Sequence, residues 1–214
     1  PRGGGAEQIM LDGDALAAGR AFFKIGGAFH SPDHGLLAWS HDDAGSEYYT
    51  LSVRNLETGH DLADAIFDTG GSAVWSEDGR SLFYVRLDAN HRPSRVFRHR
   101  IGTSPEDDVL VYEESDPGFF VSVGKTLSRR FIVIDAHDHQ TSEARLIPAD
   151  APKTPPILVA ARETGVEYSV EEAHDLGHAA DPADAPLVHR HVGELVIEAE
   201  LEGVVEPGGV VHHE

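Results

Sequence analysis

Two short stretches of the chain contain a serine in a setting that could activate it as a nucleophile. A nucleophile elbow has glycine at both ends of G-x-S-x-G, so that its strained turn can approach the neighbouring strands closely. Residues 70–74 (GGSAV) end in valine, and residues 102–106 (GTSPE) end in glutamate, where the second glycine belongs. We interpret both stretches as turns, so the chain is expected to carry no catalytic triad and to be inactive alone.

Two glycine-containing stretches could in principle bind phosphate groups. Residues 124–126 (GKT) match the end of a phosphate-binding loop, but Phe119 stands where that loop needs its first glycine. Residues 3–5 (GGG) lack the third glycine of a dinucleotide-binding fingerprint. The first stretch resembles a strand and a turn and the second a flexible loop, so we predict no cofactor.

The histidines form two pairs that could bind a metal. Residues 137–139 (HDH) carry two imidazoles two positions apart, which on a strand would share one face. No third ligand is evident nearby, so we interpret the stretch as a surface loop and keep a metal site as the alternative. His212 and His213 give an equally weak signal. The sequence therefore predicts no catalytic, cofactor-binding or metal-binding residue.

The strongest pattern in the chain is a repeat. Residues 31–40 (SPDHGLLAWS) return at residues 76–85 (SEDGRSLFYV), and more weakly at residues 125–134. Each copy is a polar turn that runs into an apolar strand. A period of about 40–50 residues with about four strands per unit is typical of β-propeller blades. We predict an all-β fold, a partial β-propeller of about three to four four-stranded antiparallel blades.

The strands follow from alternation and from turn residues. We expect strands at residues 28–30, 36–40 and 48–54 in the first unit, at 72–75, 81–85, 95–100 and 108–112 in the second, and at 119–123, 131–134 and 143–147 in the third. Residues 157–160 would open a fourth unit, residues 8–11 form a short strand and residues 14–19 a helical turn. The strand at 48–54 alternates as a half-buried strand does. The aromatic residues at matched repeat positions are expected in the core: Trp39, Trp75, Phe83, Tyr84 and Phe131.

The character of the chain changes near residue 174. Residues 174–214 contain no Phe, Tyr or Trp, and they hold six His and nine acidic residues against a single arginine. We assign residues 1–173 to the partial propeller. Residues 174–214 form a divergent acidic, His- and Val-rich tail, either remnant blade strands or disordered, in which residues 194–201 could be a strand.

Composition excludes several classes of function. The net charge is −20, which repels phosphate backbones and favours cationic partners. Cysteine is absent, which rules out disulfides and weakly favours a reducing compartment, so we expect a cytoplasmic protein. No run of about 18 apolar residues is present, so we expect neither a membrane span nor a membrane partner. The start of the chain, PRGGG, has no initiator methionine, and we expect it to lie within a longer protein.

Several long stretches resemble the N-terminal propeller domain of oligopeptidase B, a branch of the prolyl oligopeptidase family. The most specific is residues 82–103, followed in register by residues 108–114; further matches are residues 7–17, 47–51, 54–59, 141–147 and 167–171. The resemblance covers roughly residues 6–173. The family more often has Asn where this chain has Asp14, and the chain departs from the family past Asp175.

The resemblance implies a non-catalytic role for the chain. In the family, a seven-bladed propeller filters short peptides by size above a Ser-Asp-His triad in a C-terminal α/β-hydrolase domain, and the oligopeptidase B branch cleaves after Arg or Lys. The implied partners are that domain of the same protein and short basic peptides, without nucleic acid. No triad residue can be carried over, because no matching position belongs to the triad. The alternatives are a stand-alone binding propeller and an enzyme whose site lies on the blades.

An incomplete ring leaves two open sides. We expect exposed apolar faces at both ends, marginal stability and self-association of the isolated chain, with proteolysis starting in its last ~40 residues.

Overall fold

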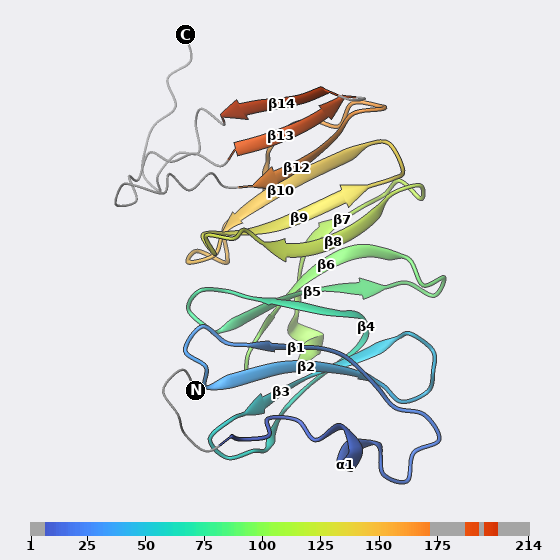
Figure 1. The fold of residues 1–214 in the computed structure, drawn as a ribbon, viewed down its shortest axis with the longest axis vertical. Coiled ribbons are helices and arrows are strands. Elements are labelled where there is room, and N and C mark those ends of the chain that lie inside the picture. The colour runs from blue at the N-terminus through green and yellow to red at the C-terminus, as the bar shows by residue number, and fades with distance from the viewer. Residues whose placement is uncertain (1–6, 172–186, 193–194, 201–214) are drawn as a thin grey trace.

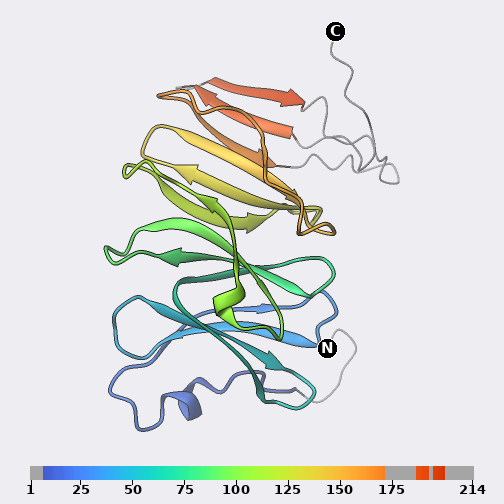
Figure 2. The same ribbon diagram turned by 180° about the vertical axis from the view of Figure 1, so that it is seen from behind.

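The computed structural model describes residues 7–171, 187–192 and 195–200, as three antiparallel sheets stacked along the long axis of the molecule (Figure 1, Figure 2). The first sheet holds seven strands in the order β1 to β7, the second runs β11-β10-β9-β8, and the third runs β12-β13-β14. The elements are α1 (Gly13–Ala17), β1 (Lys24–His30), β2 (Leu36–Asp42), β3 (Tyr49–Asn55), β4 (Asp61–Trp75), β5 (Ser81–Leu87), β6 (Pro93–Arg100), the 3-10 helix η1 (Pro105–Asp107), β7 (Val109–Glu113), β8 (Phe120–Lys125), β9 (Phe131–His137), β10 (Ser142–Pro148), β11 (Ile157–Leu158), β12 (Glu167–Glu171), β13 (Leu187–Val192) and β14 (Leu195–Glu200).

The seven-stranded sheet is two blades joined through one long strand, β4. Its first half pairs with β3, ending at Thr69 opposite Tyr49, and its second half pairs with β5, from Thr69 opposite Arg86 to Trp75 opposite Leu82. We call β1–β3 with residues 61–69 blade 1, residues 69–75 with β5–β7 blade 2, and β8–β11 blade 3. The predicted antiparallel blades are confirmed. The separate strand expected at residues 72–75 is instead the end of a 15-residue strand that also completes blade 1.

The sequence repeat corresponds to one hydrogen-bonded turn in each of the first three blades. The hydroxyl oxygens of Ser31, Ser76 and Thr126 accept from the backbone N–H five residues later, at 2.9, 3.0 and 3.2 Å. In the first two turns the same hydroxyl donates to an aspartate two residues on. The third copy is therefore aligned on Thr126, one residue later than the sequence pattern indicates. The turn fixes where each second strand begins.

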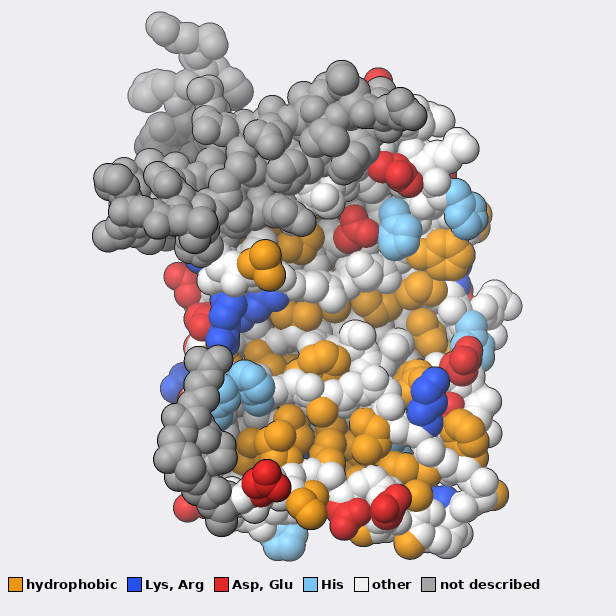
Figure 3. All heavy atoms as spheres, viewed as in Figure 1, with side chains coloured by type: hydrophobic (Ala, Val, Ile, Leu, Met, Phe, Trp, Pro, Cys, Tyr) orange, Lys and Arg blue, Asp and Glu red, His pale blue; other side chains and the backbone are white. Residues whose placement is uncertain are grey.

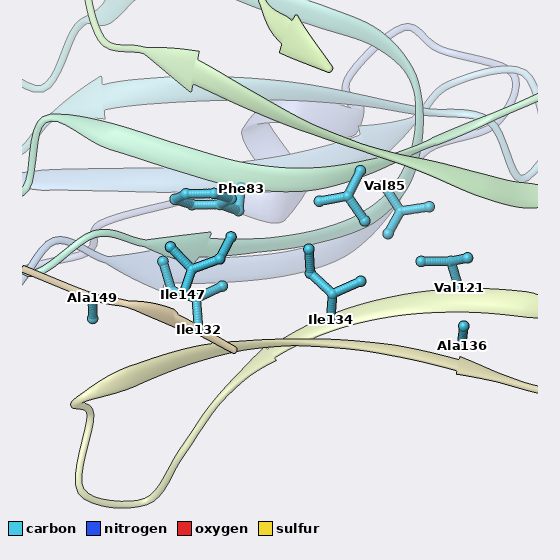
Figure 4. Close-up of a cluster of buried hydrophobic side chains, with 9 residues drawn as sticks. Phe83, Val85, Val121, Ile132, Ile134, Ala136, Ile147 and Ala149 are labelled. Atoms are coloured by element: carbon cyan, nitrogen blue, oxygen red, sulfur yellow. The ribbon is translucent and has the colours of Figure 1, made fainter. Parts of the chain in front are cut away.

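Apolar side chains from facing sheets form the core between successive blades. One cluster joins blade 1 to blade 2 and contains Leu51, Ile66 and Leu82. The other joins blade 2 to blade 3, where Phe83 and Val85 meet Ile132 and Ile134 (Figure 4). The aromatic residues predicted for the core are all buried: Trp39, Trp75, Phe83, Tyr84 and Phe131. Blade-to-blade packing accounts for Trp75, Phe83 and Tyr84, which belong to these two clusters.

The outer face of blade 1 is covered, which the sequence did not predict. Trp39 is 3% exposed and Ser52 opposite it is 9% exposed, so strand β3 is buried on both faces instead of half-buried. The segment 7–23 lies over this face (Figure 1), where Phe23 stacks on His41 and Arg54 donates to the Met10 carbonyl oxygen at 3.1 Å. The apolar face that was expected to be exposed at this end of the arc is therefore covered by the chain itself.

Four smaller expectations are settled by the described residues. Helix α1, at Gly13–Ala17, overlaps the helical turn predicted at residues 14–19, whereas residues 8–11 form no strand. Residues 157–158 form β11, which ends blade 3 instead of opening a fourth unit. The strand expected at residues 194–201 is β14, and it pairs with β13, which pairs with β12. Residues 172–186 and 201–214, where most of the predicted tail falls, lie outside the described residues. No helix in the described part is long and apolar enough to cross a membrane.

Candidate functional site

The innermost strands of the blades form one face of the molecule. Strands β1 and β8 and the end of β4 lie on the side seen in Figure 1, whereas β7 and η1 lie on the opposite side, seen in Figure 2. On the inner face hydrophobic side chains gather between the strand ends, and most charged side chains lie nearer the edges (Figure 3). The exposed side chains along β4 and β8 alternate with buried ones and include Ser72, Phe120 and Ser122. This face is therefore weakly polar and carries few charged side chains (Figure 3).

A second repeated feature, an aspartate that accepts hydrogen bonds from its own loop, organises the loops at one edge of this face. Asp42, Asp88 and Asp138 each begin the loop between the second and third strands of a blade. The Asp42 carboxylate accepts from the N–H groups of Ala44, Gly45 and Glu47 at 2.8–2.9 Å. The carboxylates of Asp88 and Asp138 each accept from two N–H groups of their own loop, at 2.7–3.0 Å.

These hydrogen bonds hold the carboxylates ionised and the loops rigid. Burial opposes the effect at Asp42, but the donated N–H groups still lower the pKa of that carboxyl. At Asp88 and Asp138 the donated N–H groups are the main cause of a lowered pKa. The spacing of the three aspartates, 46 and 50 residues, follows the blade period, and this signal in the sequence could have identified the loops.

The loops of blades 1 and 2 clasp each other. The Tyr48 hydroxyl donates to the Asp88 carbonyl oxygen at 2.8 Å, and the rings of Tyr48 and His91 lie 3.9 Å apart. His91 Nε2 lies 2.5 Å from the Ser46 carbonyl oxygen. Glu47 and His91 both adopt left-handed backbone conformations, with φ of 60°. Because left-handed backbone is uncommon for residues other than glycine, we infer that the contact between the two loops holds both residues in this conformation.

A pocket lies beside this contact between the two loops. Its volume of about 480 Å³ is within the usual range for ligand-binding cavities. Blades 1, 2 and 3 all contribute to it. Its walls are Val85, Leu87, Pro93, Val121 and Val123, and its polar groups come from Glu47, Tyr49, Ser72, His91 and Ser122, with Gly70 between them. The residues come from segments up to 76 positions apart in the chain, and sequence reasoning identified none of them as a site.

Tyr49 shapes the pocket by packing on glycine backbone. A side chain at Gly26 would place its Cβ 2.6 Å from the Tyr49 ring, and one at Gly71 would place it 3.0 Å away. The ring therefore fits only because these positions lack a Cβ. Lys24 lies beside Tyr49, and contact with that residue, followed by the charges of Glu47 and Asp42, raises the pKa of Lys24.

A separate polar cluster is closed to solvent. His99 Nδ1 lies 2.7 Å from the Asp108 carboxylate, which also accepts from the Tyr84 hydroxyl at 2.8 Å. The side chain of His99 is fully buried, and burial raises the pKa of Tyr84. The cluster joins strands β5 and β6 to the turn before β7, and the side chains of His99 and Asp108 are both buried, so its role is structural.

The sequence candidates are placed as follows. Ser72 lies on β4 and faces the pocket, and Ser104 caps η1 by accepting from Glu106 N–H at 3.3 Å. Lys125 of the GKT stretch donates to the Trp75 carbonyl oxygen at 3.0 Å and to Glu77 at 2.7 Å, so it joins blade 3 to blade 2.

The structure also locates part of the histidine pair at residues 137–139. His137 ends β9 and contacts the Asp135 carboxylate at 2.8 Å. In the described part of the chain no group of three His, Cys, Asp or Glu side chains is placed to hold a metal. The glycines at 3–5, His212 and His213 lie outside the described residues.

The comparisons with known proteins agree with this architecture. A family model described as the prolyl oligopeptidase N-terminal β-propeller domain matches residues 1–187. Dipeptidyl aminopeptidase BI from Pseudoxanthomonas mexicana is 39% identical over 170 residues, which cover 79% of this chain and 23% of the relative. Protease 2 from Moraxella lacunata is 33% identical over 171 residues, which cover 79% of this chain and 25% of the relative.

Solved structures give the same picture. Oligopeptidase B from Leishmania major superposes with a TM-score of 0.81 at 28% identity, over 91% of this chain and 27% of the other. Oligopeptidase B from Trypanosoma brucei with covalently bound antipain, in a closed form, gives a TM-score of 0.80 at 30% identity, over 94% and 28%. The chain spans about a quarter of the length of these proteins.

Proposed function

This chain belongs to the prolyl oligopeptidase family as its N-terminal β-propeller domain, and we propose that it controls the access of short basic peptides to a hydrolase domain of the same protein. The observation that carries the proposal is the inner face: three blades present a weakly polar surface with a pocket at its edge, on a domain whose family is named for a peptidase. The proposed parent protein is a serine peptidase that cleaves after Arg or Lys.

The residues on the inner face support a role in substrate access more than a role in catalysis. The inner strands expose small side chains such as Ser72 and Ser122, and His91 in the same pocket is engaged by the Ser46 carbonyl oxygen. The relatives are about four times as long as the matched part, which leaves room for a catalytic domain. We propose, as expected from the sequence, that the parent protein is cytoplasmic.

The experiment that tests this function compares the chain alone with the complete protein encoded by its gene. We expect the complete protein to hydrolyse Arg- and Lys-containing peptide amides and to be inhibited by a serine-directed phosphonate, whereas the 214-residue chain alone shows no turnover. Substrates with free and with blocked N-termini should both be tested, because one relative is named as a dipeptidyl aminopeptidase. A gene that encodes no hydrolase domain would favour a stand-alone binding propeller, and turnover by the chain alone would contradict the proposal.

The negative charge of the chain adds a kinetic prediction for the complete protein. A field of −20 charges attracts cationic peptides, and salt screens it over a Debye length of about 8 Å at physiological ionic strength. We expect kcat/KM for a dibasic peptide to fall as salt rises, more steeply than for a neutral peptide of equal length. Equal salt dependence of the two peptides would show that the charge does not steer substrates.

A further inference from the structure

We propose that the pocket between blades 1, 2 and 3 binds a peptide in extended form, with a basic side chain of the peptide at Glu47. This inference rests on the proposed function, because it names the pocket in which a peptide would bind before it reaches the hydrolase domain. It is carried by separate observations, namely the open edge of β8, the apolar walls and the charge at this pocket.

Two strand edges border the pocket, one from β8 and one from the end of β4. Strand β8 is the last strand of its sheet, so its outer edge is unpaired among the described residues. The end of β4 pairs with β5 alone, and that pairing is interrupted between Thr69 and Ala73. Within this stretch the Gly71 N–H donates to the Thr69 hydroxyl and the Gly71 carbonyl oxygen accepts from the Ser40 hydroxyl, so β8 is the edge that remains open to a peptide. Both edges reach the pocket through small residues, Gly70 and Ser72 on β4 and Ser122 on β8. An extended peptide recognises such an edge by backbone hydrogen bonds.

The walls of the pocket suit alternate side chains of an extended peptide. Val85, Leu87 and Pro93 come from blade 2, and Val121 and Val123 come from blade 3. Successive side chains of a strand point to opposite faces. A peptide lying along β8 would therefore place an apolar side chain between these walls and the next one toward the rim, where Glu47, Tyr49 and His91 lie.

Glu47 gives the rim its charge preference. Its carboxylate is exposed and forms no ion pair within the described residues, whereas its N–H is held by the Asp42 carboxylate at 2.8 Å. The backbone is thus fixed, and the carboxylate stays exposed to a ligand, although its charge also acts on Lys24 and helps to raise the pKa of that residue. Lys24 is drawn to Tyr49 and does not line the pocket. A cationic side chain that enters the pocket therefore meets a preorganised carboxylate.

The test is binding of a hexapeptide with one arginine among apolar residues to the purified chain, with its citrulline analogue as the neutral control. We expect Glu47→Gln to weaken binding of the arginine peptide about tenfold, the size of one charge-assisted hydrogen bond, and to leave the citrulline peptide unchanged. Glu57→Gln removes the same charge at an exposed turn that does not line the pocket, and it should change both affinities less than twofold. Equal effects of the two variants would show general charge attraction and would overturn the site.

Strand addition and the cavity itself are tested separately. Backbone N-methylation at alternate residues of the peptide should abolish binding in one register and spare it in the other. Ser122→Trp should fill the pocket and block binding, whereas Leu127→Trp, at a position that is 88% exposed, should not. An unchanged melting midpoint confirms that the variants fold.

The outcomes separate this inference from the proposed function. If the chain binds no arginine peptide, or if neither Ser122→Trp nor N-methylation matters, the pocket is not the binding site. Access control by the propeller in the complete protein could still be measured. If the complete protein proves not to be a peptidase but Glu47 still selects arginine peptides, the binding site stands and the proposed function fails.

Discussion

His41 is the central member of a stack of side chains on the outer face of blade 1. Its ring lies 5.6 Å from that of Phe23 and 5.0 Å from that of Trp39, and Arg20 and Arg54 lie over the outer rings at 5.3 and 5.4 Å. Both arginines are paired with aspartates, Arg20 with Asp43 and Arg54 with Asp61. The Nδ1 atom of His41 is buried and has no hydrogen-bond partner among the residues that the structure describes.

This environment favours the neutral imidazole. Burial lowers the pKa of His41, and the attraction of Asp43 only partly opposes it. A lowered pKa means that the unfolded chain takes up the proton first. The stabilisation is therefore complete above the ordinary histidine pKa of about 6.5 and is lost as the pH falls below it.

We predict that His41→Phe, which keeps the stack but cannot titrate, reduces the loss of stability between pH 7.5 and pH 5.5. The melting temperature of the wild type should fall roughly 2 °C further over this range than that of the variant. His60→Gln, which replaces an exposed histidine in a turn, serves as the matched control and should follow the wild type. Parallel pH profiles for wild type and His41→Phe would contradict the assignment.

At the scale of elements, β4 decides how the first two blades are joined. Its residues 70 and 71 are glycines at the point where the strand leaves β3 and joins β5. Gly71 has a φ of 88°, and its carbonyl oxygen accepts from the Ser40 hydroxyl at 2.6 Å. The left-handed backbone and the Tyr49 ring beside it both require a residue without a Cβ.

Gly71→Ala should therefore destabilise the chain more than the same change at another left-handed glycine. Gly59 has a φ of 73° and open space where a Cβ would lie, so Gly59→Ala shows the cost of conformation alone, about 1 kcal/mol. We expect Gly71→Ala to cost about 2–3 kcal/mol, because the Tyr49 ring must also move. Urea denaturation measures both values, and equal costs would show that the ring gives way freely.

At the scale of the whole molecule, the N-terminal segment protects the first blade. Residues 7–23 lie along the outer side of blade 1 (Figure 1), where Phe23 stacks on His41 and Arg54 donates to the Met10 carbonyl oxygen. Leu37 and Trp39 of the same blade are 2% and 3% exposed, although neither belongs to the apolar cluster between blades 1 and 2. The opposite end of the described structure is the sheet β12-β13-β14. The arc of blades is thus covered at its first end by its own chain.

Removal of residues 1–23 should uncover this face. We expect a lower melting temperature and concentration-dependent self-association in analytical ultracentrifugation, because a contiguous apolar surface is exposed. Removal of residues 1–6 alone should change neither property. A deletion variant that stays monomeric and melts like the intact chain would show that the segment does not protect blade 1.

The sequence by itself determined what local interactions encode. The turns at Ser31, Ser76 and Thr126 close over five residues, so their pattern repeats visibly and predicts the blades. The buried aromatic residues and the lack of a nucleophile elbow were equally local signals. The covering of the outer face of blade 1 was not predicted, because the segment that covers this face does so through contacts far apart in sequence, such as Arg54 to Met10.

Only the tertiary structure decided where the candidate site lies. Glu47, Ser72 and Ser122 come from three different blades, and the segment around each does not indicate a shared pocket. They meet because β4 is shared between blades 1 and 2 and because the apolar clusters set how blade 3 packs on blade 2. Such packing depends on the fit of many side chains at once, which no short pattern in the sequence records.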